Sequence, residues 1–429
     1  MRIAAVLIIL LFLTSGGVAM AEPKTVTMPD ITPEMAVRIQ KDTDGYRKGD
    51  AVITVVDEHG RPVEGVSIRA EQVTHDFLFG CNIYMFEGLG TPERNARYKE
   101  LFKRVMNYAT LPFYWRGFEP ERGKPQYEHN HRIAQWCREN GITTKGHPLV
   151  WACHDAGVPK WLPKDDHAEV KRLMEERIKD IIPRYKSEIG IWDVVNESTH
   201  GERFAGMSVL DLTSQPVRWA REVGPNDMLI VNEFGVMGDR KGTGPFYKLI
   251  KQMKADGVPF DAIGVQTHMH GGPWSLKDIM GTLDKYRDLG LPIHLTETTV
   301  LSGRETSEPD QEKLQASYVE KFYRVCFSHP AVKAITWWDF SDAGAWQGVA
   351  AGLIRKDLTP KPVYLVLDDL INKEWTTVAN GKTAADGTYA FRGFAGDYEV
   401  TATAPSGSIK ARLHIAESSS ARTTVRPSH

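Results

Sequence analysis

The chain has 429 residues, of which 41% are hydrophobic and 25% are charged, and its formal net charge is -2. This length exceeds that of a typical single domain, and the composition is that of an ordinary water-soluble globular protein. Because 53 basic residues are balanced by 55 acidic ones, no strongly basic surface is expected. The composition therefore argues against a nucleic-acid partner.

The N-terminus has the three parts of a secretory signal peptide. Arg2 precedes an apolar run over residues 3–13, and residues 19–21 (Ala-Met-Ala) form a small-x-small cleavage site. We therefore expect residues 1–21 to be removed and the mature protein, beginning at Glu22, to be secreted or periplasmic. The apolar run is too short for a membrane anchor, and no membrane span is expected after cleavage.

Eight short apolar segments alternate with stretches of helical periodicity in the middle of the chain. The apolar segments are bounded by glycine, proline and polar residues, as buried parallel strands are. Between them, Ala168–Ser187 has the spacing of an amphipathic helix. Eight strand–helix repeats predict an α/β fold, the (β/α)8 TIM barrel, for residues 76–372. The expected strands are Phe77–Ile83, Tyr108–Phe113, Ile142–Leu149, Ile189–Val195, Met228–Val231, Ala262–Gln266, Ile293–Thr296 and Ala334–Trp338.

The two flanks of the barrel have a different pattern. Residues 22–75 are expected to form a linker and β-strands, with Asp50–Gln72 as a strand–turn–strand unit. Residues 373–429 alternate without helical periodicity and predict an Ig-like β-rich domain, whose end at Ser418–His429 is expected to be frayed. Either both flanks form one small β-sandwich into which the barrel is inserted, or the first flank caps the barrel and the tail folds alone.

The four cysteines, Cys81, Cys137, Cys153 and Cys326, show no metal-binding spacing. Cys137 and Cys153 flank one expected strand, and export would permit a disulfide between them. Buried free thiols fit the sequence equally well. The sequence alone does not decide between these two states.

Two glutamates lie where expected barrel strands end. Glu197 ends the run IGIWDVVNE on the fourth strand, and Glu297 ends PIHLTE on the seventh. The carboxyl ends of the strands form the active-site face of such a barrel, so the two side chains can approach one bond from opposite sides. A single glutamate there would suggest a structural ion pair. The matched pair instead predicts retaining glycoside hydrolysis, with Glu197 as general acid/base and Glu297 as nucleophile.

The motifs around these glutamates resemble glycoside hydrolase family 10, the β-1,4-xylanases, and most of all its plant-type branch. WDVVNE at residues 192–197 resembles the acid/base motif of the family, and LTE at residues 295–297 resembles its nucleophile motif. The resemblance covers residues 77–370. It implies an endo-1,4-β-xylanase that acts on a polysaccharide or oligosaccharide, as a monomer, without a metal or a cofactor.

Further motifs that resemble the family occur in the expected order. They are KGHPLVW, IVNEF, GVQTH and WWDFSDAGAW, which begin at Lys145, Ile230, Gly264 and Trp337. By this resemblance His268 bonds the nucleophile and His147 lines the site of the sugar on the nucleophile side. The substrate-binding residues implied in this way are His147, Trp151, Asn196, Asn232, Gln266, His268, Trp338 and Trp346.

The sequence also departs from the family pattern. A Glu-Asn pair and a Lys that grip distal xylose units in the family are absent, and Tyr114 directly precedes the retained Trp115. Ala152 replaces a His. Thr299 stands where the family has an Asp that supports the His beside the nucleophile, so water or another donor is expected there. Asp339 stands where the family usually has Gly.

Two other strand-end features have less specific interpretations. Glu233 is expected to support the site by hydrogen bonds, without a chemical role. His268 and His270 share one face of a strand like a metal pair, but no third ligand is evident.

Three functions remain open after these departures. The leading prediction is cleavage of β-1,4-xylan. The alternatives are retaining hydrolysis of another β-linked glycan, which the lost distal contacts favour, and a non-catalytic carbohydrate-binding barrel, against which the retained carboxylates argue.

Overall fold

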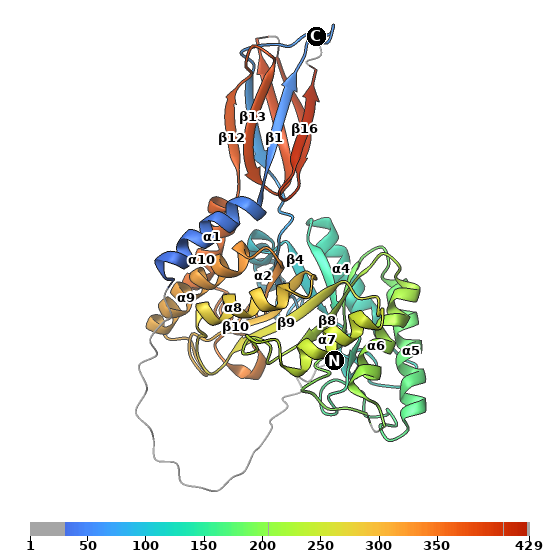
Figure 1. The fold of residues 1–429 in the computed structure, drawn as a ribbon. Helices are drawn as coiled ribbons and strands as arrows, with labels where there is room; N and C mark the ends of the chain where they lie inside the picture. The colour runs from blue at the N-terminus through green and yellow to red at the C-terminus, as the bar shows by residue number, and fades with distance from the viewer. Residues whose placement is uncertain (1–30, 205, 406, 427–429) are drawn as a thin grey trace.

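The computed structural model describes residues 31–204, 206–405 and 407–426. The expected signal peptide lies outside these residues. The described chain forms a helix-covered barrel with a β-sandwich projecting from one end (Figure 1). No helix in the described part of the chain has both the length and the apolar character needed to traverse a bilayer.

The predicted barrel is confirmed. Its parallel strands follow the order β5-β4-β3-β11-β10-β9-β8-β7, and a further pairing of β5 with β7 closes the sheet. A two-residue strand, β6 (Val150–Trp151), continues the third expected strand after a break and also pairs with β7. The barrel strands are β3 (Leu78–Asn82), β4 (Tyr108–Pro112), β5 (Thr143–His147), β7 (Ile191–Asn196), β8 (Met228–Glu233), β9 (Ala262–Met269), β10 (Ile293–Val300) and β11 (Val332–Trp337).

Helices between these strands form the outer layer. The predicted amphipathic segment becomes α5 (His167–Arg184), whose N-terminus is capped by the Asp166 side chain. Its apolar face, which includes Val170, Met174 and Ile178, is fully buried. The other helices are α2 (Pro92–Val105), α3 (Trp115–Phe118), α4 (Tyr127–Glu139), α6 (Val209–Val223), α7 (Pro245–Ala255), α8 (Leu276–Arg287), α9 (Pro309–Ser328) and α10 (Pro362–Asp369).

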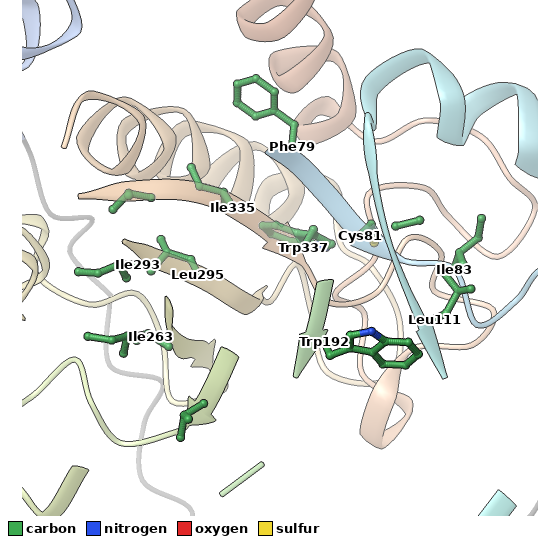
Figure 2. Close-up of a cluster of buried hydrophobic side chains, with 14 of the residues drawn as sticks. Phe79, Cys81, Ile83, Leu111, Trp192, Ile263, Ile293, Leu295, Ile335 and Trp337 are labelled. Atoms are coloured by element: carbon green, nitrogen blue, oxygen red, sulfur yellow. The ribbon is translucent and has the colours of Figure 1, made fainter. Parts of the chain in front are cut away.

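The barrel core consists of large apolar side chains that point inward from the strands and outward against the helices. Phe79, Trp192 and Trp337 are among its fully buried members (Figure 2). Burial of each such side chain contributes about 1.5–3 kcal/mol to folding. This rigid core holds the strand ends, and therefore the site residues on them, in fixed positions.

Both flanks enter the same sandwich, as the first of the two alternatives expects. One sheet has the order β13-β1-β16 and the other the order β12-β2-β14-β15. The expected fraying of the C-terminal end is wrong for residues 420–425, because they pair with β1 as a parallel strand. The strands are β1 (Lys48–Val55), β2 (Ser67–Gln72), β12 (Val378–Lys382), β13 (Thr388–Phe394), β14 (Gly396–Ala404), β15 (Gly407–Ile415) and β16 (Ser420–Val425).

Residues 22–75, expected to be a linker and β-strands, also contain a helix that the sequence pattern does not predict. Helix α1 (Pro33–Tyr46) begins at the N-cap Thr32, whose side chain accepts a hydrogen bond from the backbone N–H of Met35. It packs against α9, and Arg38 forms a two-point ion pair with Asp284. Only Met35 of this helix is buried. The apolar pattern of the segment is therefore weak, and sequence periodicity does not predict the helix.

All four cysteines are free thiols. Cys137 is buried and Cys153 is half-buried, so the disulfide alternative is wrong and the free-thiol alternative is confirmed.

Arg47 joins the sandwich to the barrel. Its guanidinium is buried and donates hydrogen bonds to the carbonyl oxygens of Phe327, His329 and Val332, at the end of α9 and the start of β11. It also pairs with Glu417 between β15 and β16, at 2.5 Å. These contacts lie at the amino-terminal ends of the barrel strands. The sandwich therefore occupies the end of the barrel opposite to the strand ends that carry the predicted catalytic glutamates.

Replacing Arg47 by alanine is expected to lower the free energy of unfolding by about 3–5 kcal/mol, because it leaves buried carbonyl groups and a carboxylate without their partner. Urea unfolding followed by circular dichroism measures this change. Arg392→Ala is the matched control, since Arg392 forms an exposed ion pair with Asp50 and such pairs contribute about 0–1 kcal/mol. Equal effects of the two substitutions would contradict the assigned role of Arg47.

Candidate active site

A cleft of about 2480 Å³ opens at the carboxyl ends of the barrel strands. Both predicted catalytic residues lie in it, together with most of the predicted substrate-binding residues. Those that line it are Trp151, Asn196, Glu197, Gln266, His268, Glu297, Trp338 and Trp346. The fold therefore brings together predicted residues from four strands, β6, β7, β9 and β10, and from the segments that follow β7 and β11.

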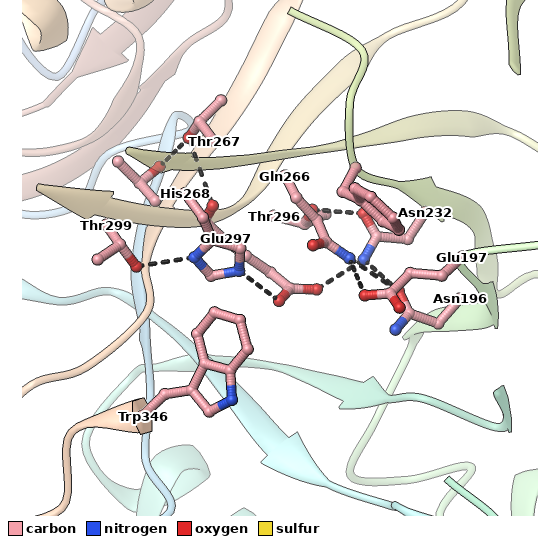
Figure 3. A network of polar contacts seen from close by, with 12 residues as sticks. Asn196, Glu197, Asn232, Gln266, Thr267, His268, Thr296, Glu297, Thr299 and Trp346 are labelled. Atoms are coloured by element: carbon pink, nitrogen blue, oxygen red, sulfur yellow. Dashed lines mark hydrogen bonds and ion pairs between the residues drawn. The ribbon is translucent and has the colours of Figure 1, made fainter. Parts of the chain in front are cut away.

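Glu297 on β10 is held by three neighbours, of which Asn232 and His268 are labelled in Figure 3. Nδ2 of Asn232 donates a hydrogen bond to Oε1 at 2.8 Å, Nε2 of His268 lies 3.1 Å from Oε2, and Nε2 of His147 lies 3.7 Å from Oε1. Burial by itself would raise the pKa of Glu297, but His147, His268 and Lys145 outweigh it and bring the pKa below its ordinary value. Glu297 is therefore ionised near neutral pH, as a nucleophile must be.

Glu197 directly follows β7, and its surroundings shift its pKa in the opposite direction to that of Glu297. Burial raises its pKa, and the negative charge of Glu297 raises it further. Hydrogen bonds from Nε1 of Trp151 to Oε2 and from Nε2 of Gln266 to Oε1, both at 2.9 Å, oppose this rise and orient the carboxyl group. A carboxyl group whose pKa is raised retains its proton and can serve as an acid.

The backbone of Glu197 is strained. Its φ is +58°, a left-handed conformation that costs on the order of 1 kcal/mol for a residue other than glycine. The backbone N–H of Glu197 donates to the carbonyl oxygen of Asn232 at 2.9 Å, which holds this conformation. The strained turn directs the carboxyl group towards the cleft.

A network of amide side chains links the two carboxylates. Oδ1 of Asn196 accepts hydrogen bonds from Asn232 at 2.8 Å and from Gln266 at 3.2 Å. This leaves the Nδ2 group of Asn196, which lines the cleft, available to a ligand. Such an amide can bond a sugar hydroxyl beside the reacting carbon. Two carboxyl groups with opposite pKa shifts are thus fixed by one network, the arrangement that separates an acid from a nucleophile.

The sequence model of glycosyl hydrolase family 10 matches residues 70–369, which include both carboxylates and every barrel strand. The chain belongs to glycosyl hydrolase family 10. The predicted family and the predicted enzyme class, a glycoside hydrolase, are thereby confirmed.

Relatives of this family 10 chain carry different names. It is 30% identical over 361 residues to "Anti-sigma-I factor RsgI6" of Acetivibrio thermocellus, a match that covers 84% of this chain but only 45% of that protein. It is 28% identical over 294 residues to "Endo-1,4-beta-xylanase B" of Thermotoga neapolitana, covering 65% of this chain and 84% of that one. The structure of xylanase 10B from Thermotoga petrophila RKU-1 in complex with xylobiose superposes with a TM-score of 0.60 at 28% identity, over 70% of this chain and 95% of that one.

His147 and Asn232 lie deeper in the barrel than the other predicted substrate-binding residues. Both are fully buried, and neither is part of the cleft lining. They contact Glu297 from within the barrel, and Nδ1 of His147 in turn lies 2.7 Å from Asp193, which pairs with Lys145. Both residues therefore support the nucleophile, and their predicted contact with a sugar stays a prediction.

Thr299 corrects another expectation. Its hydroxyl group lies 2.8 Å from Nδ1 of His268 (Figure 3). The threonine itself therefore occupies the place of the family aspartate, and no additional donor is needed. A neutral hydroxyl group replaces a negative charge at this position, so His268 is oriented without a second carboxylate.

Glu233 lies close to the catalytic pair but bonds elsewhere. It accepts hydrogen bonds from the backbone N–H and the hydroxyl group of Thr199, at 2.8 and 2.7 Å, and lies 3.3 Å from His200. It therefore stabilises the loop that follows Glu197, in agreement with the predicted supporting role.

Aromatic side chains complete the cleft, among them two tyrosines that are not in the predicted substrate-binding set. Tyr84 and Tyr114 line it, and the Tyr84 ring packs edge-on against Trp338 with centroids 5.7 Å apart. Trp346 is 45% exposed at the rim, and its ring lies 4.9 Å from His268. No local pattern marks Tyr84, which acquires its position only when β3 and β11 pair.

Asp339 anchors the loop that carries Trp346. Oδ1 accepts a hydrogen bond from the backbone N–H of Trp346 at 3.0 Å, whereas Oδ2 has no hydrogen-bond partner among the described residues. Burial raises the pKa of Asp339 to about 7. This carboxyl group thus has both a structural contact and an unusual affinity for a proton.

Asp339→Asn is expected to change how stability depends on pH. Between the ordinary pKa of an aspartate and about 7 the native state holds a proton that the unfolded state has released, so stability falls as pH rises through this window. Asparagine keeps the acceptor for Trp346 and cannot ionise. The advantage of the variant over the wild type should therefore grow from pH 4 to pH 7, by at most about 1.4 kcal/mol per pH unit, and then stay constant. Urea unfolding at several pH values tests this, and parallel curves would contradict it.

Proposed function

We propose that this protein is a secreted retaining endo-1,4-β-xylanase. The single observation that carries the proposal is the pair of carboxyl groups with opposite pKa shifts, half-buried Glu197 raised and buried Glu297 lowered, at the ends of two barrel strands. Retaining hydrolysis requires such a pair, one protonated and one ionised.

The proposed reaction has two steps. Glu297 attacks the anomeric carbon while Glu197 donates its proton to the leaving oxygen, and a covalent glycosyl-enzyme forms. Glu197, now ionised, then takes a proton from a water molecule that attacks the same carbon and releases Glu297. The free amide of Asn196 is suited to the 2-hydroxyl group of the attacked sugar, a contact that strengthens in the transition state.

The substrate class is supported by the relatives and by the cleft. One relative is named an endo-1,4-β-xylanase, and a similar solved structure contains xylobiose. The cleft of about 2480 Å³ is larger than the roughly 300–1,000 Å³ of common small-molecule pockets. Several sugar units therefore fit in it, which favours attack within a polysaccharide chain.

A second candidate function is carbohydrate binding without turnover. One relative, which matches 84% of this chain, is named an anti-sigma factor and not a hydrolase. The intact catalytic pair favours the enzyme. Both functions use the same cleft, so activity is the property that separates them.

Product analysis of the mature protein separates these functions. The substrates are glucuronoxylan and arabinoxylan beside cellulose, mixed-linkage glucan and mannan, with Glu297→Ala as the inactive control. Xylo-oligosaccharides from the wild type alone, released first as the β-anomer by NMR, support the proposal. Cleavage of another glycan would keep the mechanism but assign a different substrate. Binding of xylan without any product would favour carbohydrate binding without turnover.

Secretion has a separate test. Expression of the whole chain in a bacterium, followed by N-terminal sequencing of the exported protein, is expected to give a chain that begins at Glu22. Retention of residues 1–21 in the cytoplasm would contradict the proposed location.

Trp151→Phe is expected to shift the pH dependence of activity. The indole N–H of Trp151 bonds Glu197 and lowers its pKa, so its removal should raise that pKa. The basic limb of the kcat/KM profile, which reports the free acid, should therefore move to higher pH. Trp346→Phe is the matched control, because Trp346 does not bond Glu197, and an equal shift in both variants would argue against Glu197 as the acid.

A further inference from the structure

Tyr114 has a fixed place on the wall of the cleft. It lies between β4 and α3, and its ring packs edge-on against His147, Trp151 and Tyr84 with centroids 5.4, 5.7 and 6.0 Å away. Two of these neighbours are themselves held by the catalytic network, since Trp151 bonds Glu197 and His147 lies 3.7 Å from Glu297. The ring is therefore positioned by the same network as the reacting carboxylates.

The hydroxyl group of Tyr114 belongs to a residue that lines the cleft together with Glu197 and Glu297. Burial raises the pKa of Tyr114 well above its ordinary value, and the charges of Glu297 and Glu197 contribute to that rise. The group is therefore a neutral O–H donor at every pH at which the catalytic pair works. No hydrogen bond from it to a carboxylate, amide or backbone group is found among the described residues, so its proton is available to a ligand in the cleft.

The hydroxyl group of Tyr84 lies beside that of Tyr114. The Tyr84 oxygen is buried and makes no hydrogen bond of good geometry among the described residues. An unpaired buried hydroxyl group is unfavourable and calls for a partner. A ligand that draws the Tyr114 proton towards itself would leave the Tyr114 oxygen as an acceptor for Tyr84, and both hydroxyl groups would then be satisfied.

The chemistry of a 1,4-linked xylopyranosyl unit limits what Tyr114 can bond. Within the chain only the 2- and 3-hydroxyl groups are free, because positions 1 and 4 carry the linkages and the ring has no exocyclic carbon. Asn196 is suited to the 2-hydroxyl group, which leaves the 3-hydroxyl group of the same sugar. The Tyr114 ring contacts His147, which lies 3.7 Å from Glu297, and Trp151, which bonds Glu197. A residue between these two neighbours is suited to contact the sugar that Glu297 attacks.

We propose that Tyr114 is a specificity-determining residue that donates a hydrogen bond to the 3-hydroxyl group of the attacked sugar, with Tyr84 behind it as a positioning residue. This rests on the proposed function and names a contact within that site. The recognised ligand is a neutral pyranose with a free 3-hydroxyl group.

The test combines a variant with a modified substrate. Tyr114→Phe keeps the ring and its packing but removes the hydroxyl group, and the substrates are an aryl β-xylobioside and its analogue that lacks the 3-hydroxyl group on the attacked sugar. The variant is expected to lose about 2- to 13-fold in kcat/KM on the complete substrate, the effect of one neutral hydrogen bond, and to match the wild type on the 3-deoxy analogue. Tyr84→Phe should give a smaller loss that also disappears on the analogue.

Tyr98→Phe is the matched control, since it removes another buried tyrosine hydroxyl without a partner, outside the cleft lining. Its kcat/KM should equal that of the wild type. An equal loss for Tyr114→Phe on both substrates, or no loss on the complete one, would overturn the assignment of Tyr114. If Tyr114→Phe does not fold, the same comparison is made with Tyr84→Phe. If the proposed xylanase function is wrong, the wild type itself will be inactive on the complete xyloside. That result would also overturn the assignment of Tyr114.

Discussion

Replacing Glu297 by alanine is expected to reduce kcat by at least about 10⁵-fold, the scale of loss when a covalent nucleophile is removed. Glu297 is the only strand-end carboxylate that both lines the cleft and has a lowered pKa among the described residues. Without it the first step has no group to attack the anomeric carbon. The measurement is initial-rate kinetics on xylan and on an aryl β-xylobioside.

Two controls make this result specific. Glu233→Gln changes another buried strand-end carboxylate, which bonds the loop after Glu197 and the backbone of Phe234 but neither catalytic glutamate, and its loss should be far smaller. Thermal unfolding should show that Glu297→Ala is folded. Azide added to this variant should occupy the vacated space and yield a glycosyl azide of inverted configuration. Activity that is undiminished in Glu297→Ala would refute the assignment.

Replacing Glu197 by alanine is expected to have an effect that depends on the leaving group. A general acid contributes about 10²- to 10⁴-fold when the leaving oxygen needs a proton. Cleavage of xylo-oligosaccharides should fall by that factor, whereas a dinitrophenyl β-xylobioside should keep most of the rate of its first step. The glycosyl-enzyme should then accumulate, because no base remains to activate water.

The measurement is the ratio of kcat/KM for the activated and the natural substrate, together with the size of the initial burst of dinitrophenolate. The basic limb of the pH profile should disappear in the variant, since Glu197 is the group whose deprotonation it reports. An equal loss on both substrates, with an unchanged pH profile, would exclude Glu197 as the acid.

The different roles of the two glutamates come from what surrounds them. Both are removed from water, which alone would raise both pKa values. Basic groups from β5 and β9, namely Lys145, His147 and His268, act on Glu297 and reverse the effect of burial there. Glu197 instead has the charge of Glu297 as its main electrostatic neighbour. One proton is therefore held on Glu197 and excluded from Glu297.

The sandwich does not contribute to this chemistry. It is anchored by Arg47 at the amino-terminal ends of the barrel strands, whereas the cleft lies at their carboxyl ends. Trp375, at the start of the C-terminal flank, is buried between the two units and stacks on Phe327 with centroids 4.0 Å apart. The sandwich and barrel are thus packed together, and substitutions at their junction should affect stability more than turnover.

By itself the sequence determined the barrel, the family resemblance and the two catalytic glutamates. Each of these depends on local signals: the alternation of apolar strands with amphipathic helices, and short motifs at strand ends such as the one that ends in Glu197. The barrel topology brings such strand ends to one face, so local pattern was sufficient to place Glu297 opposite Glu197.

Only the tertiary structure decided the rest. Strand β1 pairs with β13 and β16 from the other end of the chain, and such distant pairings leave no local signature. The contact of His147 with Glu297 and the contact of Thr299 with His268 depend on which side chains meet when strands pack. The pKa values of the catalytic pair have the same origin, because burial and neighbouring charges come from strands that are distant in sequence and adjacent only in the fold.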